Sequence, residues 1–134
     1  MTGPAARDLP SLGLTGAYRM RWKRRRLLWR ALRARHQLQL FADQRGPIPA
    51  QGVLVFVVLR NESLRLPYFL KHYRDLGAAH FLVVDNGSDD GSTALLAAQP
   101  DVTLWQTTAS YRDARFGLDW LGWLLIRHGH RRWC

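Results

Sequence analysis

The feature that most constrains the fold is a run of seven apolar residues, Val53–Leu59, four of which are valine. β-Branched residues favour strands, and an unbroken apolar run is typical of a strand that is buried on both faces. Such strands occur in the parallel sheets of α/β proteins, where helices cover both sides of the sheet. The run therefore predicts a central strand of a parallel sheet.

Helix and strand signals alternate along the rest of the chain. Pro67 suits the first turn of a helix, Gly77 suits its end, and the polar turn Asp85–Ser92 can cap the next helix. The predicted elements are a helix from Pro67 to Leu76, a strand His80–Val84, a helix from the polar turn to about Gln99, a strand Val102–Trp105, a helix Phe116–His128 and the start of a fourth strand at Arg132–Cys134. With right-handed crossovers, this order predicts an α/β fold with a doubly wound, mainly parallel, Rossmann-like sheet.

The positive charge of the chain is concentrated before this α/β region. The formal net charge is +10, and residues 1–50 contain 11 basic and 2 acidic residues. Apolar residues recur at helical spacing at Leu27, Ala31, Ala34, Leu38 and Phe41, which predicts a helix. Gly46–Pro49 has the composition of a linker. We therefore expect a basic N-terminal helical arm with its linker at residues 1–50, and an α/β domain at residues 51–134.

Three interpretations of the basic arm are open. The helix can be a solvated surface of the protein, it can be attracted to anionic lipid, or residues 19–35 can bind a nucleic-acid backbone. Tyr18, Trp22 and Trp29 suit a membrane interface, but they could equally cover apolar surface of the α/β domain. Since no nucleic-acid-binding module follows the arm, we favour the first two interpretations and disfavour nucleic acid as a partner.

The sequence also indicates where in the cell the protein is located. Its longest apolar run is far shorter than the roughly 20 residues of a membrane-spanning helix. No secretory signal is recognisable, and Cys134 is the single cysteine, which fits a reducing compartment. We expect a cytoplasmic protein, with peripheral association at the inner face of the membrane as an option for the basic arm.

Polar segments follow each predicted strand, at the end of the sheet where α/β proteins bind ligands. These segments are Arg60–Glu62, Asp85–Ser92 and Thr107–Arg115. Because the carboxyl ends of parallel strands share one edge, we expect the three segments to converge. Carboxylates there can accept hydrogen bonds from a base or a ribose, and an arginine can pair with phosphate.

The sequence excludes several common types of ligand site. A dinucleotide site would need Gly-x-Gly-x-x-Gly after the first strand, where Arg60–Ser63 stands instead, and no phosphate-binding P-loop motif is present. The turn Asn86–Gly91 is no EF-hand, because the bidentate acid would fall at Ala97. His128, His130 and Cys134 are too few, and wrongly spaced, for a common structural zinc site. No metal ligands are therefore assigned.

Two of these segments resemble a known family. The resemblance rests on Leu59-Arg60-Asn61-Glu62, on Pro67-Tyr68-Phe69-Leu70-x-His72-Tyr73 followed by Leu76-Gly77, and on Val83-Val84-Asp85-Asn86-Gly87-Ser88-Asp89-Asp90-Gly91-Ser92. Together they resemble the N-terminal half of a family 2-type glycosyltransferase with the GT-A fold, in the bacterial branch whose motif reads Val-Asp-Asn-x-Ser-x-Asp-Gly. The resemblance covers roughly residues 53–134 and implies transfer of a sugar from a nucleotide-sugar donor in glycan or surface polysaccharide synthesis.

The resemblance also implies the residues of a nucleotide-sugar site. Asp85 matches the acid that contacts the nucleobase or ribose, and Asn86 stands where many relatives have a second Asp. Arg115 lies in Ala114-Arg115-Phe116-Gly117, which is similar to the family's Ala-Arg-Asn-x-Gly and places it near the base or pyrophosphate. The implied nucleotide-sugar-binding residues are Asn61, Glu62, Asp85, Asn86, Asp90 and Arg115. Ser88 and Asp90 can alternatively serve only to shape the turn and cap a helix.

The family's Asp-x-Asp motif, whose carboxylates hold Mg²⁺ or Mn²⁺, is not found in this sequence, and no Asp or Glu follows Asp119. No catalytic residue is therefore assigned, no cofactor is expected within residues 1–134, and Mg²⁺ or Mn²⁺ is expected for the complete family domain. We expect the chain to be a fragment that does not transfer sugar by itself. The alternatives are a non-catalytic nucleotide-binding or interaction module, and a basic nucleic-acid-binding protein.

Overall fold

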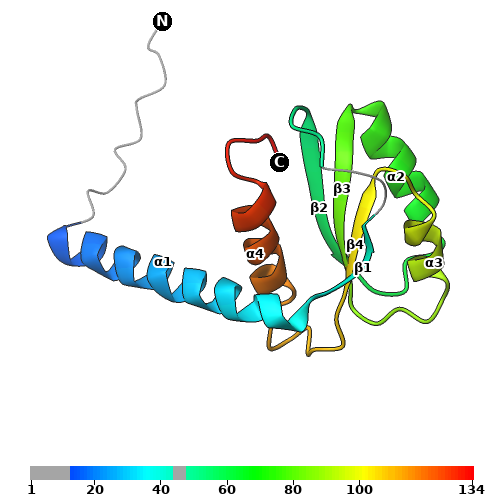
Figure 1. The fold of residues 1–134 in the computed structure, drawn as a ribbon. Coiled ribbons are helices and arrows are strands. Elements are labelled where there is room, and N and C mark those ends of the chain that lie inside the picture. The colour runs from blue at the N-terminus through cyan, green and yellow to red at the C-terminus, as the bar shows by residue number, and fades with distance from the viewer. Residues whose placement is uncertain (1–12, 44–47) are drawn as a thin grey trace, which may run out of the picture.

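A mixed four-stranded sheet forms the centre of the protein (Figure 1). The computed structural model describes residues 13–43 and 48–134. The strands are β1 (Gln39–Asp43), β2 (Val53–Leu59), β3 (Ala78–Asp85) and β4 (Val102–Gln106), in the order β1-β4-β3-β2. β2, β3 and β4 are parallel, and β1 is antiparallel to β4. The expected parallel α/β sheet is therefore confirmed for three strands.

Helices cover both faces of this sheet. α2 (Leu66–Asp75) and α3 (Ser92–Ala97) pack on one face around Leu70, Phe81 and Leu96. α4 (Leu118–His128) and the end of α1 (Leu14–Ala34) pack on the other face around Leu82, Trp120 and Leu124. Figure 1 shows the two layers on opposite sides of the strands. This arrangement confirms an α/β domain with two helical layers and is compatible with a Rossmann-like fold.

The predicted central position of Val53–Leu59 is wrong. β2 lies at one edge of the described sheet, where β3 is its neighbour, and Val53 is 41% exposed. The central strand is β3, in which Phe81–Val84 are fully buried. The apolar run specifies a strand, but its position follows from the crossovers, which place β3 and β4 successively on the same side of β2.

The basic arm also differs from the prediction. α1 ends at Ala34, a short 3-10 helix covers Arg35–Gln37, and β1 follows. Leu38 and Phe41 therefore do not extend the helical stripe, although Ala31 and Ala34 are buried as expected. β1 pairs with β4 because the backbone groups on the open side of β4 need hydrogen-bond partners. Of the expected linker, Gly46 and Pro47 lie outside the described residues.

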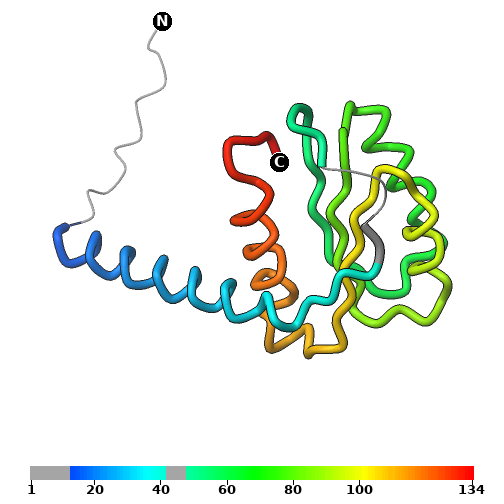
Figure 2. The backbone as a smooth tube through the Cα atoms, in the orientation of Figure 1, coloured from blue at the N-terminus to red at the C-terminus, as the bar shows by residue number. Residues whose placement is uncertain are grey.

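The C-terminal segment forms no fourth strand. After α4, residues 129–132 turn, and Arg132–Cys134 have no strand assignment. One backbone hydrogen bond, from Leu54 N–H to the carbonyl of Trp133 at 2.9 Å, holds this segment beside the start of β2. Figure 2 follows the chain through this return. α4 begins two residues later than predicted, at Leu118, because Phe116 has a left-handed backbone (φ 57°).

Candidate functional site

The strand register places the three polar segments at one edge of the sheet. Leu59 at the end of β2 is paired with Asp85 at the end of β3, and Asp85 is paired with Gln106 at the end of β4. The chain therefore leaves all three parallel strands at the same level. This edge is the position where ligands bind in open α/β sheets, as the sequence led us to expect.

Asn61 connects the loop after β2 to the loop after β3. Its backbone N–H donates to Ser88 Oγ at 2.9 Å, and its side-chain Oδ1 accepts from the N–H of Asp89 at 2.9 Å. Asn61 has a left-handed backbone (φ 55°), a conformation that asparagine adopts more readily than most residues. The predicted ligand residue therefore has a clear structural role in fixing the two loops together.

Asp90 makes a second connection between these loops. Its Oδ2 accepts from the N–H of Ser63 at 2.9 Å, and its Oδ1 accepts from the N–H of Ser92 at 3.0 Å and from Ser92 Oγ. The Ser92 hydroxyl, followed by the Ser63 N–H, holds the pKa of Asp90 far below its ordinary value of 3.8. Glu62 N–H donates to Ser92 Oγ at 3.0 Å. These contacts agree with the interpretation of Asp90 as a residue that shapes the turn at the start of α3.

Asp85 is fully buried, unlike Asp90. Its Oδ1 accepts from the N–H of Ser88 at 2.9 Å, and its Oδ2 accepts from the Thr93 hydroxyl. Both oxygens thus hold the turn between β3 and α3. A contact between this carboxylate and a ligand would require the turn to open, so a ligand-binding role for Asp85 stays a prediction.

Asn86 joins the loops after β3 and β4. Its Nδ2 donates to the carbonyls of Thr107 at 3.2 Å and Ala109 at 3.0 Å, and its backbone N–H donates to the carbonyl of Leu59. Among the described residues, its Oδ1 has no hydrogen-bond partner. Asn86 therefore fixes the third loop with one end of its amide and leaves an acceptor at the other.

These three loops surround a cavity of about 330 Å³. The cavity is lined by Val58, Leu59, Arg60, Glu62, Asn86 and Tyr111. Two of the six predicted site residues, Glu62 and Asn86, line it, whereas the other four do not. Sequence reasoning missed Tyr111 and Arg60 as individual residues, although both lie in the polar segments that it identified.

The third loop reaches the cavity through an unusual backbone. Arg115, Phe116 and Gly117 have consecutive positive φ angles of 50°, 57° and 80°. At Gly117, a Cβ atom would lie 2.9 Å from Val58 Cγ2 and 3.2 Å from Tyr111 Cε2, so only glycine fits without displacement. Non-glycine residues with this backbone are strained, and such strain is concentrated at functional sites. The loop therefore positions Tyr111 against β2 at a cost in backbone energy.

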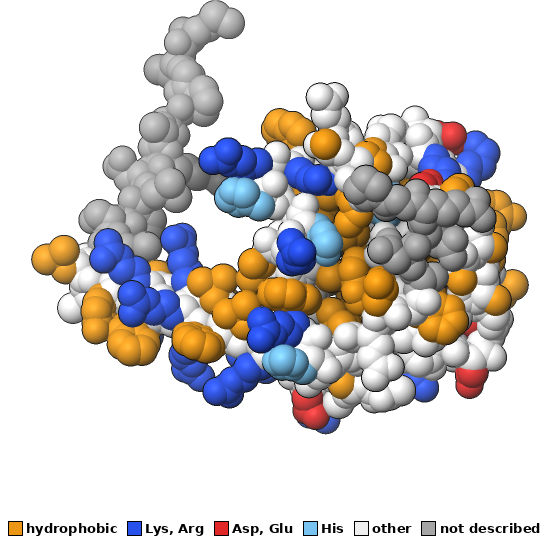
Figure 3. All heavy atoms as spheres, viewed as in Figure 1, with side chains coloured by type: hydrophobic (Ala, Val, Ile, Leu, Met, Phe, Trp, Pro, Cys, Tyr) orange, Lys and Arg blue, Asp and Glu red, His pale blue; other side chains and the backbone are white. Residues whose placement is uncertain are grey.

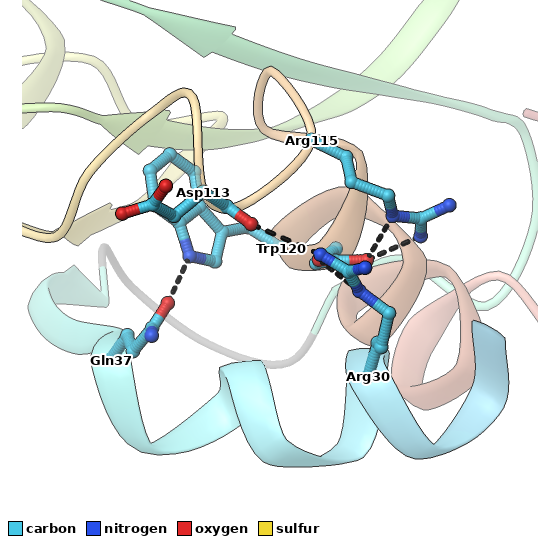
Figure 4. Close-up of polar contacts among 6 residues, drawn as sticks. Arg30, Gln37, Asp113, Arg115 and Trp120 are labelled. Atoms are coloured by element: carbon cyan, nitrogen blue, oxygen red, sulfur yellow. Dashed lines mark hydrogen bonds and ion pairs between the residues drawn. The ribbon is translucent and has the colours of Figure 1, made fainter. Parts of the chain in front are cut away.

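Arg115 binds a carboxylate outside the cavity (Figure 4). Arg115 donates to Asp119 Oδ1 from Nε, at 2.7 Å, and also from Nη2. Arg30 Nε of α1 donates to the other carboxylate oxygen, Asp119 Oδ2, at 3.2 Å. Arg30 Nη2 also donates to the carbonyl of Asp113 at 3.1 Å. Asp119 is 5% exposed, so one buried carboxylate links the third loop to the basic arm. Arg115 therefore pairs with Asp119 and does not line the cavity, so its predicted role near a base or pyrophosphate stays a prediction.

A second contact in Figure 4 fixes the arm at the same place. Trp120 Nε1 donates to Gln37 Oε1 at 2.8 Å, and Trp120 itself is fully buried. On α1, Ala31 packs closely against α4, since a Cβ on Gly122 would lie 3.4 Å from Ala31 Cβ. No local sequence pattern predicts these contacts, because the partners are more than eighty positions apart along the chain.

The described residues do not form a metal centre. Among the side chains that the structure describes, no three or more of His, Cys, Asp and Glu are placed together to hold an ion. Asp85 and Asp90 are engaged by hydroxyl and backbone N–H groups. This donor set does not fit Mg²⁺ or Mn²⁺.

Comparison with known proteins gives no match. No protein-family model, no curated protein and no solved structure matches the chain at the significance required. None of the helices that the structure describes combines the length and the apolar character needed to cross a bilayer.

Proposed function

We propose that the chain is the nucleotide-sugar-binding part of a family 2-type glycosyltransferase with the GT-A fold. The observation that carries the proposal is the cavity at the carboxyl edge of the sheet, into which the Asn61-Glu62 segment and the Asp85–Ser92 segment both lead. These are the segments on which the resemblance rests. The proposed reaction of the complete domain is transfer of a sugar from the bound nucleotide to a glycan acceptor.

The cavity lining suits a nucleoside. Glu62 and the Oδ1 atom of Asn86 can accept hydrogen bonds from base N–H groups or ribose hydroxyls. Tyr111 offers an aromatic ring for stacking, and Arg60 offers a cation for phosphate oxygens. A volume of about 330 Å³ is near the lower end for small-molecule sites, which suits a nucleoside with its phosphates at the open side.

A second candidate is nucleotide binding without sugar transfer. It is favoured because residues 1–134 contain no Asp-x-Asp motif, whose carboxylates would hold the metal ion in the family that the chain resembles. Titration with a nucleotide-sugar and with the matching nucleoside diphosphate distinguishes the two candidates. Tighter binding of the nucleotide-sugar supports a sugar-donor site, and equal binding of both ligands supports the second candidate.

Calorimetric titration tests the binding site itself. Uridine and guanosine diphosphates, and their sugar conjugates, are titrated into the full chain at physiological salt. We expect binding that Glu62→Gln and Tyr111→Ala each weaken by about tenfold, equivalent to about 1.4 kcal/mol. Glu62→Gln keeps the size and the backbone contacts of the side chain, so the loss would report on its charge.

Two exposed residues of α2 provide matched controls. Asp75→Asn removes a carboxylate, and Tyr68→Ala removes a 78% exposed aromatic ring on the same helix. Both should leave binding unchanged. Equal weakening by the controls, or no binding of any nucleotide by the folded chain, would refute the proposed site.

A further inference from the structure

The surface of α1 that faces away from the α/β domain carries a row of exposed aromatic and apolar side chains. A helix turns by about 100° per residue, so Leu14, Tyr18, Trp22 and Trp29 lie along one side. Their exposed fractions are 92%, 62%, 52% and 64%, respectively. We call these four residues the outer stripe. In a globular protein, such a row is normally buried, and its exposure indicates a partner.

The outer stripe lies opposite the side of α1 that packs on the domain. Leu27, Ala31 and Ala34 project to the other side of the helix, where Ala31 and Ala34 are buried. Tyr18 and Trp22 contact each other edge to face, with ring centroids 6.3 Å apart, instead of contacting the domain. The outer stripe therefore does not cover apolar surface of the α/β domain, which was one of the sequence-based interpretations.

The charge of α1 is of one sign. Leu14–Ala34 contains eight Arg and Lys residues and no acidic residue. Among the described residues, Arg30 is the only one of the eight with an ion-pair partner. Figure 3 shows basic and hydrophobic side chains, and no acidic ones, on the end of α1 that projects from the domain. Seven cations are thus left facing solvent beside the aromatic side chains.

We propose that α1 lies in the surface of an anionic lipid bilayer, with the outer stripe inserted at the level of the headgroups. Trp and Tyr prefer this interface, and flanking Arg and Lys side chains can extend to the lipid phosphates while their methylene stems cover acyl chains. Arg25, which lies on the same side of the helix as the outer stripe, is long enough to do the same. A helix of 21 residues, about 31 Å long, is typical of helices that lie in the interface.

The lipid surface fits these observations better than a nucleic acid. A nucleic-acid backbone would account for the basic residues, but it leaves a row of aromatic and leucine side chains without a role. The close contacts of Ala31 with α4 and of Arg30 with Asp119 hold the end of α1 on the domain. The α/β domain and its cavity would therefore be held at the bilayer surface.

Vesicle flotation with the full chain tests the proposal. The probes are vesicles of phosphatidylcholine alone, and vesicles of phosphatidylcholine and phosphatidylglycerol in equal parts. We expect binding to the anionic vesicles only, weakened by about tenfold in Trp22→Ala/Trp29→Ala and by about tenfold in Arg21→Gln/Arg25→Gln. The matched controls Tyr68→Ala/Trp133→Ala and Arg65→Gln/Lys71→Gln remove the same kinds of exposed side chain elsewhere and should bind as the parent chain does.

Fluorescence quenching provides a second measurement, on the parent chain itself. Lipids with brominated acyl chains should quench the tryptophan fluorescence of the bound chain, and Trp22→Phe/Trp29→Phe should lose most of this quenching. Equal binding to neutral vesicles, or equal loss in the control variants, would overturn the proposal. It would also be overturned by tighter binding to duplex DNA than to anionic vesicles, with no effect of the tryptophan substitutions. Self-association that buries Trp22 and Trp29 without lipid would do the same.

Discussion

The carboxyl edge of the sheet and the basic helix α1 differ in how their polar side chains are partnered. At the edge, Asn61, Asn86 and Asp90 make hydrogen bonds that tie neighbouring loops together, and Asp85 holds the turn between β3 and α3. On α1, Arg30 alone among the described basic side chains has an ion-pair partner. The edge is therefore a preformed structure around a cavity, whereas α1 carries Arg and Lys side chains that face solvent without ion-pair partners.

This difference separates two kinds of recognition. A cavity with fixed walls selects a ligand by shape and by a few directed hydrogen bonds. A row of free cations on a helix attracts any anionic surface, with a strength that falls as salt increases. Asp119 is where the two regions meet, because it binds Arg30 of α1 and Arg115 of the third loop.

The largest expected loss of stability follows substitution of Asp85, at the carboxyl edge of the sheet. Asp85→Ala removes the acceptor of both the Ser88 N–H and the Thr93 hydroxyl in a fully buried position. We expect a loss of about 3 kcal/mol of unfolding free energy, measured by urea denaturation. Asp89→Ala, in the same turn but exposed, is the control and should cost less than about 0.5 kcal/mol. Equal losses would mean that the edge is no more preformed than the exposed surface.

The next effect separates backbone strain from close packing in the third loop. Gly117→Ala must adopt a φ of 80° and bring a Cβ to 2.9 Å from Val58. We expect it to cost about 2 kcal/mol or more. Gly87→Ala also requires a positive φ, of 72°, but has open space around the new Cβ, so it should cost about 1 kcal/mol. A smaller loss for Gly117→Ala than for Gly87→Ala would contradict the tight contact with β2.

Asp119→Asn tests the contact between the two regions. An amide cannot accept from both Arg30 and Arg115 as a carboxylate does, and both guanidinium groups can return partly to water. We expect a loss of about 1–2 kcal/mol, with faster hydrogen exchange at residues 27–34 of α1. Asp75→Asn, which breaks the exposed Lys71 pair on α2, should cost a few tenths of a kcal/mol and leave α1 unchanged. Unchanged exchange in Asp119→Asn would show that α1 is held by apolar packing alone.

The smallest expected effect is a loss of stability at acidic pH. Hydrogen bonds from Arg74 hold the pKa of Asp101 below 3.8, and those from Ser92 and Ser63 do the same for Asp90. Groups with a lowered folded pKa stabilise the native state above pH 3.8, and this contribution is lost as the pH falls below that value. The urea midpoint should therefore fall on acidification below about pH 4, and it should fall less in Asp90→Asn and in Asp101→Asn. A midpoint that is independent of pH there would contradict these hydrogen bonds.

Local patterns predicted most of the α/β elements. The Pro67 and Gly77 signals mark α2, which spans Leu66–Asp75 and is followed by Gly77 with a φ of 93°. The convergence of the three polar segments was also predictable, because parallel strands end at a common edge. Neither result depends on knowing which residues far apart in the chain touch each other.

The features that sequence reasoning missed all depend on distant contacts. β1 forms because the open side of β4 lacks a partner, and β2 lies at the edge because successive crossovers run in one direction. Tyr111 lines the cavity because Gly117 allows the third loop to approach Val58. No role was predicted for Asp119, since its partner Arg30 comes into contact only when α1 packs on α4.

The most direct test of the proposed site compares two ligands by nuclear magnetic resonance. Uridine diphosphate and inorganic pyrophosphate carry similar charge, but only the first has a base and a ribose. At physiological salt, uridine diphosphate should shift the amide signals of Arg60–Glu62, Asn86 and Tyr111, while pyrophosphate should shift signals of α1 at low salt only. If both ligands shift the same α1 signals and neither affects the cavity residues, the chain recognises charge and the proposed nucleotide site is wrong.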